Sequence, residues 1–111
     1  TEHILQTLRG HGYSVEEVVA CGGPTKSKLW MQIHADVCQV PVVVPAETEA
    51  CALGSAMVAA VHVGDFPTLE AAASSMVRLT GTIEPQPGAR DVYMEGYEKY
   101  LKLYQALAGV R

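Results

Sequence analysis

The sequence predicts an α/β domain in which parallel strands are flanked by helices. Two short segments, 15–21 with its apolar run at 18–20 and the apolar segment 40–44, contain several valines and are expected to be buried strands. The segment between them, 26–38, carries apolar residues at helical spacing. Because two strands joined by a crossover helix form a βαβ unit, we expect these strands to be parallel.

The first half of the chain is expected to alternate helix and strand. A helix over 2–9 has apolar residues at helical spacing, and glycines supply its end. The strand over 15–21 stops at a Gly-Gly-Pro turn, and prolines punctuate both ends of the second strand. The helix over 26–38 is expected to bury one apolar stripe, formed by Leu29, Trp30, Ile33 and Val37.

Three helices and an extended segment are expected in the second half. Thr48 is a candidate N-cap for a long helix to about residue 63, and Thr68 for a shorter one to residue 76 or 77. The segment 78–84 should be extended, and Asp91 is expected to cap a last helix to about residue 107. That helix carries tyrosines at spacings of three and four, at Tyr93, Tyr97, Tyr100 and Tyr104. One packed stripe with its hydroxyls at the rim is the preferred interpretation, with a partner groove as the alternative.

A sheet of two or three strands would have long edges that the helices alone do not cover. We therefore expect the sheet to be completed by chain outside this sequence. An unfinished edge could also pair with a second copy of the chain, which would give a homodimer.

Composition excludes several classes of function. The formal net charge is −4, so there is no basic field to attract nucleic acid or an anionic membrane. The longest apolar run, 50–63, is about one-third short of the ~20 residues of a membrane span, and no membrane crossing is expected. The three cysteines form no CxxC pair and are expected to be reduced thiols in the cytoplasm.

The most specific stretch lies at the first strand-to-helix junction and reads Gly22-Gly23-Pro24-Thr25-Lys26-Ser27. Glycines allow a ligand to approach the backbone, and a helix start presents unpaired N–H groups and a positive dipole end. This pattern is typical of a ligand cradle at the carboxyl edge of a parallel sheet, although geometry alone leaves a plain turn equally open. The stretch is not a P-loop, because Ala20 and Thr25 occupy the positions that need glycine.

The same stretch resembles the adenosine-binding segment of the FGGY carbohydrate kinases. The residues that carry the resemblance are Gly22-Gly23-x-x-Lys26-Ser27-x-Leu29-Trp30-x-Gln32-Ile33-x-Ala35-Asp36. It continues in order through the Pro-Val-Val-Val-Pro strand, the segments 47–56 and 64–72, and the Glu-Pro loop before the last helix. Within that family, the sequence is most similar to the ribulokinase and ribitol kinase branch. The resemblance implies the ribonuclease-H-like fold of actin and hexokinase, with residues 1–111 as its incomplete C-terminal, nucleotide-binding portion.

The resemblance also implies a function and its residues. Gly22 and Gly23 would lie against the nucleotide, with the backbone of Gly23 near the phosphates and ribose, and Ser27 would lie beside the adenine edge. Gly54 would let its helix pack close behind this loop. The parent protein would phosphorylate a small sugar or polyol, a pentulose or pentitol being favoured, with ATP and Mg²⁺. The sugar-binding and catalytic part of the family precedes this segment, so we expect no catalytic residue here, an inactive isolated chain, and magnesium held mainly through the nucleotide and the missing part.

Other candidate groups have simpler explanations. His34 and Cys38 are four residues apart on one helix but lack further ligands, so no metal site is expected. Glu47 and Glu49 flank a helix start, where carboxylates are favourable without acid–base chemistry. Lys26 could reach a phosphate, although a solvated lysine is commoner. Two functional alternatives stay open: a noncatalytic nucleotide-binding module of the same fold, and an interaction domain whose Gly-Gly turn binds nothing.

Overall fold

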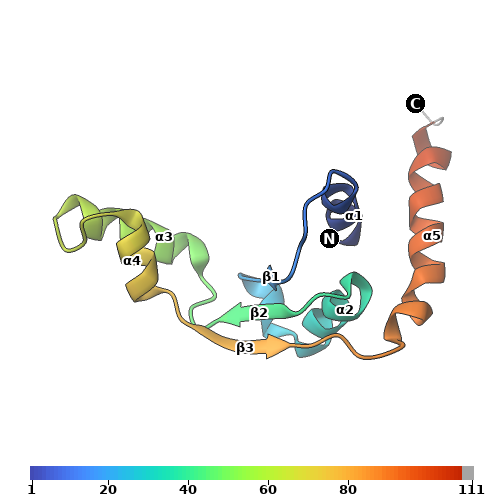
Figure 1. The fold of residues 1–111 in the computed structure, drawn as a ribbon, viewed down its shortest axis with the longest axis horizontal. Helices are drawn as coiled ribbons and strands as arrows, with labels where there is room; N and C mark the ends of the chain where they lie inside the picture. Colours follow the sequence, from blue (N-terminus) through green and yellow to red (C-terminus); the bar gives the residue numbers. More distant parts are fainter. Residues whose placement is uncertain (109–111) are drawn as a thin grey trace.

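The computed structural model describes residues 1–108. Figure 1 shows the helices and strands, which follow the expected order. A short 3-10 helix, η1, is added at the Gly-Gly turn. Their bounds are α1 Glu2–Gly10, β1 Val18–Val19, η1 Gly23–Lys26, α2 Lys28–Cys38, β2 Val42–Pro45, α3 Ala50–His62, α4 Leu69–Met76, β3 Leu79–Ile83 and α5 Ala89–Ala108. The α/β class predicted from the sequence is confirmed.

The strands form one sheet in the order β1-β2-β3. β1 and β2 are parallel, with Val18 opposite Val42, which confirms the predicted βαβ unit. β3 is antiparallel to β2, with Ile83 opposite Val42. The prediction of parallel strands therefore holds for β1 and β2 only. The helical hairpin α3–α4 returns the chain to the end of the sheet where β2 finishes, so β3 must run back along it (Figure 1).

The core lies where α2 packs against α1 and the sheet. One buried cluster joins Leu5, Cys38 and Val40, and a second joins Met31, Ala35 and Val42. The predicted buried stripe of α2 holds only in part: Ile33 and Val37 are partly buried. Leu29 and Trp30 on the same stripe are 71% and 50% exposed. The helix has a second apolar face, and that face contacts the sheet.

The chain is extended in shape. Its radius of gyration is 17.9 Å, whereas a compact chain of this size would have about 13 Å. Figure 1 shows why: α3 and α4 project to one side of the sheet and α5 stands on the other. α3 is rich in apolar residues, yet none of its residues is buried. No helix within residues 1–108 is both long enough and apolar enough to cross a membrane.

The helix starts agree only in part with the predicted caps. Thr68 caps α4 as predicted, because its Oγ1 accepts a hydrogen bond from the Ala71 amide at 3.2 Å. The prediction for Thr48 is wrong: α3 begins after Glu49, whose amide donates to the carboxylate of Glu47 at 2.8 Å. The Asp91 cap is also wrong, because α5 begins at Ala89 and Asp91 lies in its first turn.

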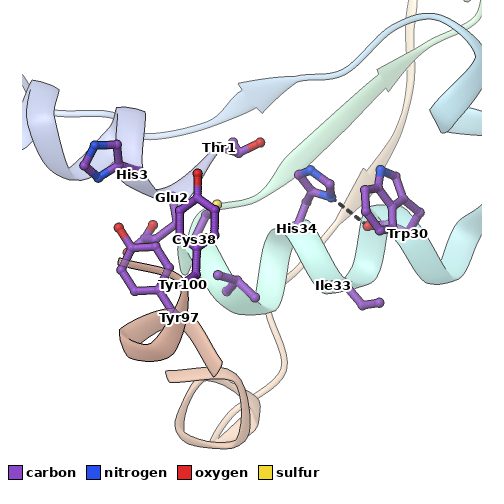
Figure 2. A pocket seen from close by; sticks show the side chains of 10 residues that line it. Thr1, Glu2, His3, Trp30, Ile33, His34, Cys38, Tyr97 and Tyr100 are labelled. Atoms are coloured by element: carbon purple, nitrogen blue, oxygen red, sulfur yellow. Dashed lines mark hydrogen bonds between the residues drawn. The ribbon is translucent and has the colours of Figure 1, made fainter. Parts of the chain in front are cut away.

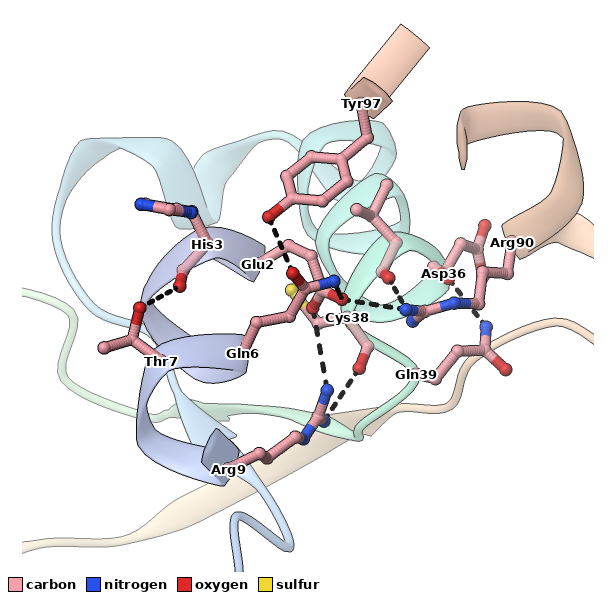
Figure 3. Close-up of polar contacts among 11 residues, drawn as sticks. Glu2, His3, Gln6, Thr7, Arg9, Asp36, Cys38, Gln39, Arg90 and Tyr97 are labelled. Atoms are coloured by element: carbon pink, nitrogen blue, oxygen red, sulfur yellow. Dashed lines mark hydrogen bonds and ion pairs between the residues drawn. The ribbon is translucent and has the colours of Figure 1, made fainter. Parts of the chain in front are cut away.

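A buried carboxylate joins α1 to the start of α5 (Figure 3). Glu2 on α1 is 4% exposed, and its Oε1 accepts a hydrogen bond from Nη2 of Arg90 on α5 at 2.8 Å. Arg9 lies 3.8 Å from the other carboxylate oxygen. Both arginines also donate to the last turn of α2, Arg90 to the Val37 carbonyl and Arg9 to the Cys38 carbonyl. They thereby provide donors for carbonyls that a helix end leaves without partners.

Removing the Arg90 guanidinium is expected to destabilise the chain markedly. An Arg90→Gln substitution would leave Glu2 buried without its nearest cation. We expect the free energy of unfolding to fall by about 3 kcal/mol, the lower end of the cost of breaking a buried ion pair. Chemical denaturation followed by circular dichroism measures this change.

Lys99→Gln is the matched control, because it breaks a surface ion pair with Glu95 in the same helix. Both of those side chains are more than 70% exposed, and exposed pairs contribute about 0.5 kcal/mol or less. Equal losses of stability in the two variants would contradict the structural role given to Glu2.

Candidate functional site

The Gly-Gly turn lies at the carboxyl edge of the parallel strand pair. The Ala20 amide donates to the Val43 carbonyl at 2.9 Å, which continues the β1–β2 ladder up to the turn. Gly22 then has φ 83° and ψ −172°, a left-handed backbone that strongly favours glycine. The turn is thus placed where ligands bind in open α/β sheets.

The backbone of Gly22 is anchored on both sides. Its N–H donates to the Thr48 carbonyl at 2.7 Å, which ties the turn to the loop between β2 and α3. Its carbonyl accepts two hydrogen bonds from Thr25, one from the amide at 3.1 Å and one from Oγ1 at 2.7 Å.

Two short helices meet at Ser27. Pro24 occupies the first turn of η1, as its fixed φ favours. The sequence predicted one helix from about Lys26. Instead, η1 ends there and Ser27 caps α2, its Oγ accepting from the Trp30 amide at 3.2 Å. The break arises because Ser27 is extended, with φ −101° and ψ 103°.

The turn presents backbone donors to solvent. In residues 1–108 the amides of Gly23, Lys28 and Leu29 have no hydrogen-bond acceptor. Gly23 and Ser27 are exposed, and Gly22 is partly buried. A Cβ added at Gly23 would meet no atom within 4 Å. An anion at this point would find unpaired N–H groups and the positive end of α2.

Gly54 does not have the packing role predicted for it. A Cβ added at this position of α3 would meet nothing within 4 Å, so no described part of the chain approaches this glycine closely. Instead, the loop before α3 is connected to the turn by the hydrogen bond that the Thr48 carbonyl accepts from the Gly22 amide.

His34 and Cys38, the remaining candidate pair, contact neighbouring residues of the fold. Nδ1 of His34 lies 2.9 Å from the Trp30 carbonyl, and its ring packs edge-on against the Trp30 ring at 5.0 Å. Cys38 is buried in the core. Within residues 1–108, no three His, Cys, Asp or Glu side chains come together in a way that could hold a metal ion.

A hollow that sequence reasoning missed lies between α1, α2 and α5 (Figure 2). Its volume is about 350 Å³, and its walls include Trp30, His34, Tyr97 and Tyr100. The Tyr97 and Tyr100 rings stack at 6.2 Å, and the Tyr97 hydroxyl donates to Oε1 of Gln6. Loss of solvent and the nearby Glu2 charge raise the pKa of Tyr97.

The tyrosine spacing was the only sequence signal for this hollow. The predicted stripe agrees for Tyr97, which is partly buried, whereas Tyr100 is 60% exposed. The side chain of Tyr104 lies outside the described part of the structure. Neither glycine of the turn nor Ser27 lines the hollow, so the hollow and the turn are separate features.

Residues 1–63, which include the whole Gly-Gly turn, match the model of the FGGY family of carbohydrate kinases, C-terminal domain. The chain belongs to the FGGY family. Its resemblance to the ribulokinase and ribitol kinase branch is a finer placement, which this match does not address.

Known FGGY proteins resemble the chain over nearly all its length. An FGGY carbohydrate kinase domain-containing protein of Xenopus laevis is 36% identical over 98% of the chain and 21% of its own length. Autoinducer-2 kinase of Salmonella typhimurium is 40% identical over 93% of the chain and 19% of its own length. The structure of xylulose kinase from Rhodospirillum rubrum superposes with a TM-score of 0.73 and 33% identity, over 98% of the chain and 22% of that protein. The chain thus spans about a fifth of the relatives it matches.

The thiols of this FGGY chain are expected to differ in reactivity. Burial, followed by the Glu2 charge, raises the pKa of the Cys38 thiol, so it stays protonated at pH 8. Cys21 and Cys51 are exposed. With Ellman's reagent at pH 8, Cys21 and Cys51 should react in the native chain and Cys38 only after denaturation. A Cys38→Ala variant should lose only the reaction that appears after denaturation, and rapid native labelling of Cys38 would contradict the described core.

Proposed function

We propose that this chain forms the nucleotide-facing part of an ATP-dependent sugar kinase, as the C-terminal portion of a nucleotide-binding domain that further chain completes. The observation that carries the proposal is the exposed Gly23 amide, which lies at a sheet edge beside a helix start and has no acceptor in residues 1–108. Membership of a family of carbohydrate kinases supports phosphoryl transfer as the activity of the parent protein.

The phosphates and ribose of the nucleotide would lie along Gly22 and Gly23. The open space at Gly23 lets a ligand approach the backbone itself. The exposed start of α2 adds the amides of Lys28 and Leu29 and the positive end of the helix dipole. Lys26, the last residue of η1, is exposed and adds a positive charge where η1 meets α2.

Ser27 would contact the adenine edge. Its oxygen already accepts the Trp30 amide, but a serine hydroxyl also carries one hydrogen that it can donate. That hydrogen can be donated to a ring nitrogen of adenine while the cap on α2 stays in place. One side chain would thus both start the helix and recognise the base.

ATP with magnesium would supply the phosphoryl group. Magnesium would be held through the nucleotide phosphates and through chain beyond this segment. The residues of this segment would bind and orient the nucleotide, and the catalytic and sugar-binding groups would lie outside it.

The rest of the parent protein would also cover the apolar surfaces that remain exposed here. Val58 and Val63, on and just after α3, are 58% and 70% exposed. We place the parent protein in the cytoplasm, where ATP is available. A pentulose or pentitol is the favoured acceptor, supported by the likeness to a xylulose kinase, whose named substrate is a five-carbon ketose.

Blocking the turn should weaken ADP binding. In a calorimetric titration of the chain with ADP, Gly23→Leu is expected to raise the Kd at least about tenfold, because the added side chain fills the space that the phosphates would occupy. Ser27→Ala should also weaken binding, whereas Ser27→Asn, which keeps both a cap and a hydrogen-bond donor, should retain it.

Gly96→Leu is the matched control for the glycine variant. Gly96 on α5 is exposed and, like Gly23, has no atom within 4 Å of an added Cβ. Equal affinities of the Gly23 and Gly96 variants for ADP would contradict the proposed site. Saturable ADP binding that Gly23→Leu and Ser27→Ala both weaken would exclude an interaction domain whose turn binds nothing.

Activity of the parent protein is the direct test of the kinase. ADP release from ATP, measured against a panel of pentuloses, pentitols and glycerol, is expected to depend on one acceptor and to name it. The purified 111-residue chain in the same assay should release no ADP above background. Nucleotide binding by the parent protein without any acceptor-dependent release would identify a noncatalytic nucleotide-binding module.

A further inference from the structure

The Thr25 hydroxyl makes a hydrogen bond at the centre of the Gly-Gly turn. Its Oγ1 donates to the Gly22 carbonyl at 2.7 Å, and Thr25 itself is partly buried. Among the described residues it is the only side chain that hydrogen-bonds to Gly22 or Gly23. The other bond to the same carbonyl, from the Thr25 amide, is longer at 3.1 Å.

This bond determines the direction of a neighbouring donor. The Gly22 carbonyl and the Gly23 N–H belong to one planar trans peptide unit, in which the two groups point in opposite directions. Because the carbonyl points towards Thr25, the Gly23 N–H must point away from it. This N–H is one of the amides without an acceptor in residues 1–108.

A peptide between two glycines turns over easily unless something holds it. Neither residue has a Cβ to restrict rotation, and no other atom lies within 4 Å of an added Cβ at Gly23. On the preceding side, the bond from the Gly22 N–H to the Thr48 carbonyl holds the residue but leaves the next peptide unit free to rotate. The Thr25 hydroxyl is the side-chain group that resists that rotation.

We propose that Thr25 is a positioning residue, whose hydroxyl holds the Gly22–Gly23 peptide so that the Gly23 N–H faces the phosphates of the bound nucleotide. The proposal rests on the proposed function of the turn. Thr25 does not itself contact the nucleotide. It acts by keeping the donor in its binding orientation before the ligand arrives, which lowers the ordering cost of binding.

The test compares two ligands that differ only in their phosphates. Binding of ADP and of adenosine is measured by calorimetry for the unaltered chain, Thr25→Val and Thr25→Ser. Valine has nearly the shape of threonine but no hydroxyl, and serine keeps the hydroxyl. Thr25→Val is expected to raise the Kd for ADP about tenfold and to leave that for adenosine within about twofold, with Thr25→Ser restoring ADP binding.

Thr7→Val is the matched control, because the Thr7 hydroxyl also donates to a backbone carbonyl, that of His3, but on α1. It should change neither affinity. The Gly23 amide signal in a ¹⁵N-edited NMR titration provides a second readout: it should shift on addition of ADP in the unaltered chain and respond much less in Thr25→Val.

Each other result overturns the proposal in a distinguishable way. If Thr25→Val binds ADP as tightly as the unaltered chain, the positioning role is wrong and the proposed function stands. If it weakens ADP and adenosine equally, the hydroxyl supports the turn in general and has no specific effect on the phosphate donor. If neither the unaltered chain nor the parent protein binds either ligand, the proposed function of the turn fails, and the positioning role fails with it.

Discussion

The buried ion pair between Glu2 and Arg90 is the constraint on which the arrangement of the helices depends. These residues are 88 positions apart, yet their contact at 2.8 Å fixes α1 against the start of α5. Both arginines that face Glu2 also donate to carbonyls at the end of α2. A charged group so poorly exposed requires its partners, because an unpaired buried charge is strongly unfavourable. α1 and the start of α5 therefore cannot separate without leaving Glu2 without its partner.

α2 connects that constraint to the candidate site. Its last turn accepts the arginine donors, its buried face contacts the sheet, and its first turn begins at Ser27 beside the Gly-Gly turn. Because α2 is one helix, the arginine contacts at its last turn also fix the position of its first turn, beside the Gly-Gly turn. The turn itself is held locally by Thr48 and Thr25. This division suits a binding site that needs fixed backbone donors on an otherwise open surface.

Local signals predicted much of the structure. The valine strands, the crossover helix and the Thr68 cap depend on neighbours in sequence, and each was found, although β1 spans only Val18–Val19 and α2 begins at Lys28. The exposure of half the α2 stripe and the direction of β3 were not predicted, because both depend on distant segments. The cap of α3 was missed by one residue, at a start where the Glu49 amide donates to Glu47. Leu29 and Trp30 look like core residues by spacing, but the sheet contacts another face of their helix. Local spacing cannot say which of two apolar faces meets a partner.

The sequence by itself determined the α/β class, the family and the position of the Gly-Gly turn, because glycine spacing and apolar periodicity are properties of short segments. Only the tertiary structure decided that Thr48 holds the turn, that Glu2 meets Arg90, and that a hollow forms beside Tyr97. These features join residues through space, and their existence follows from how the helices pack. A hydrogen bond between residues distant in sequence produces no periodic pattern in the sequence, so only the three-dimensional structure shows it.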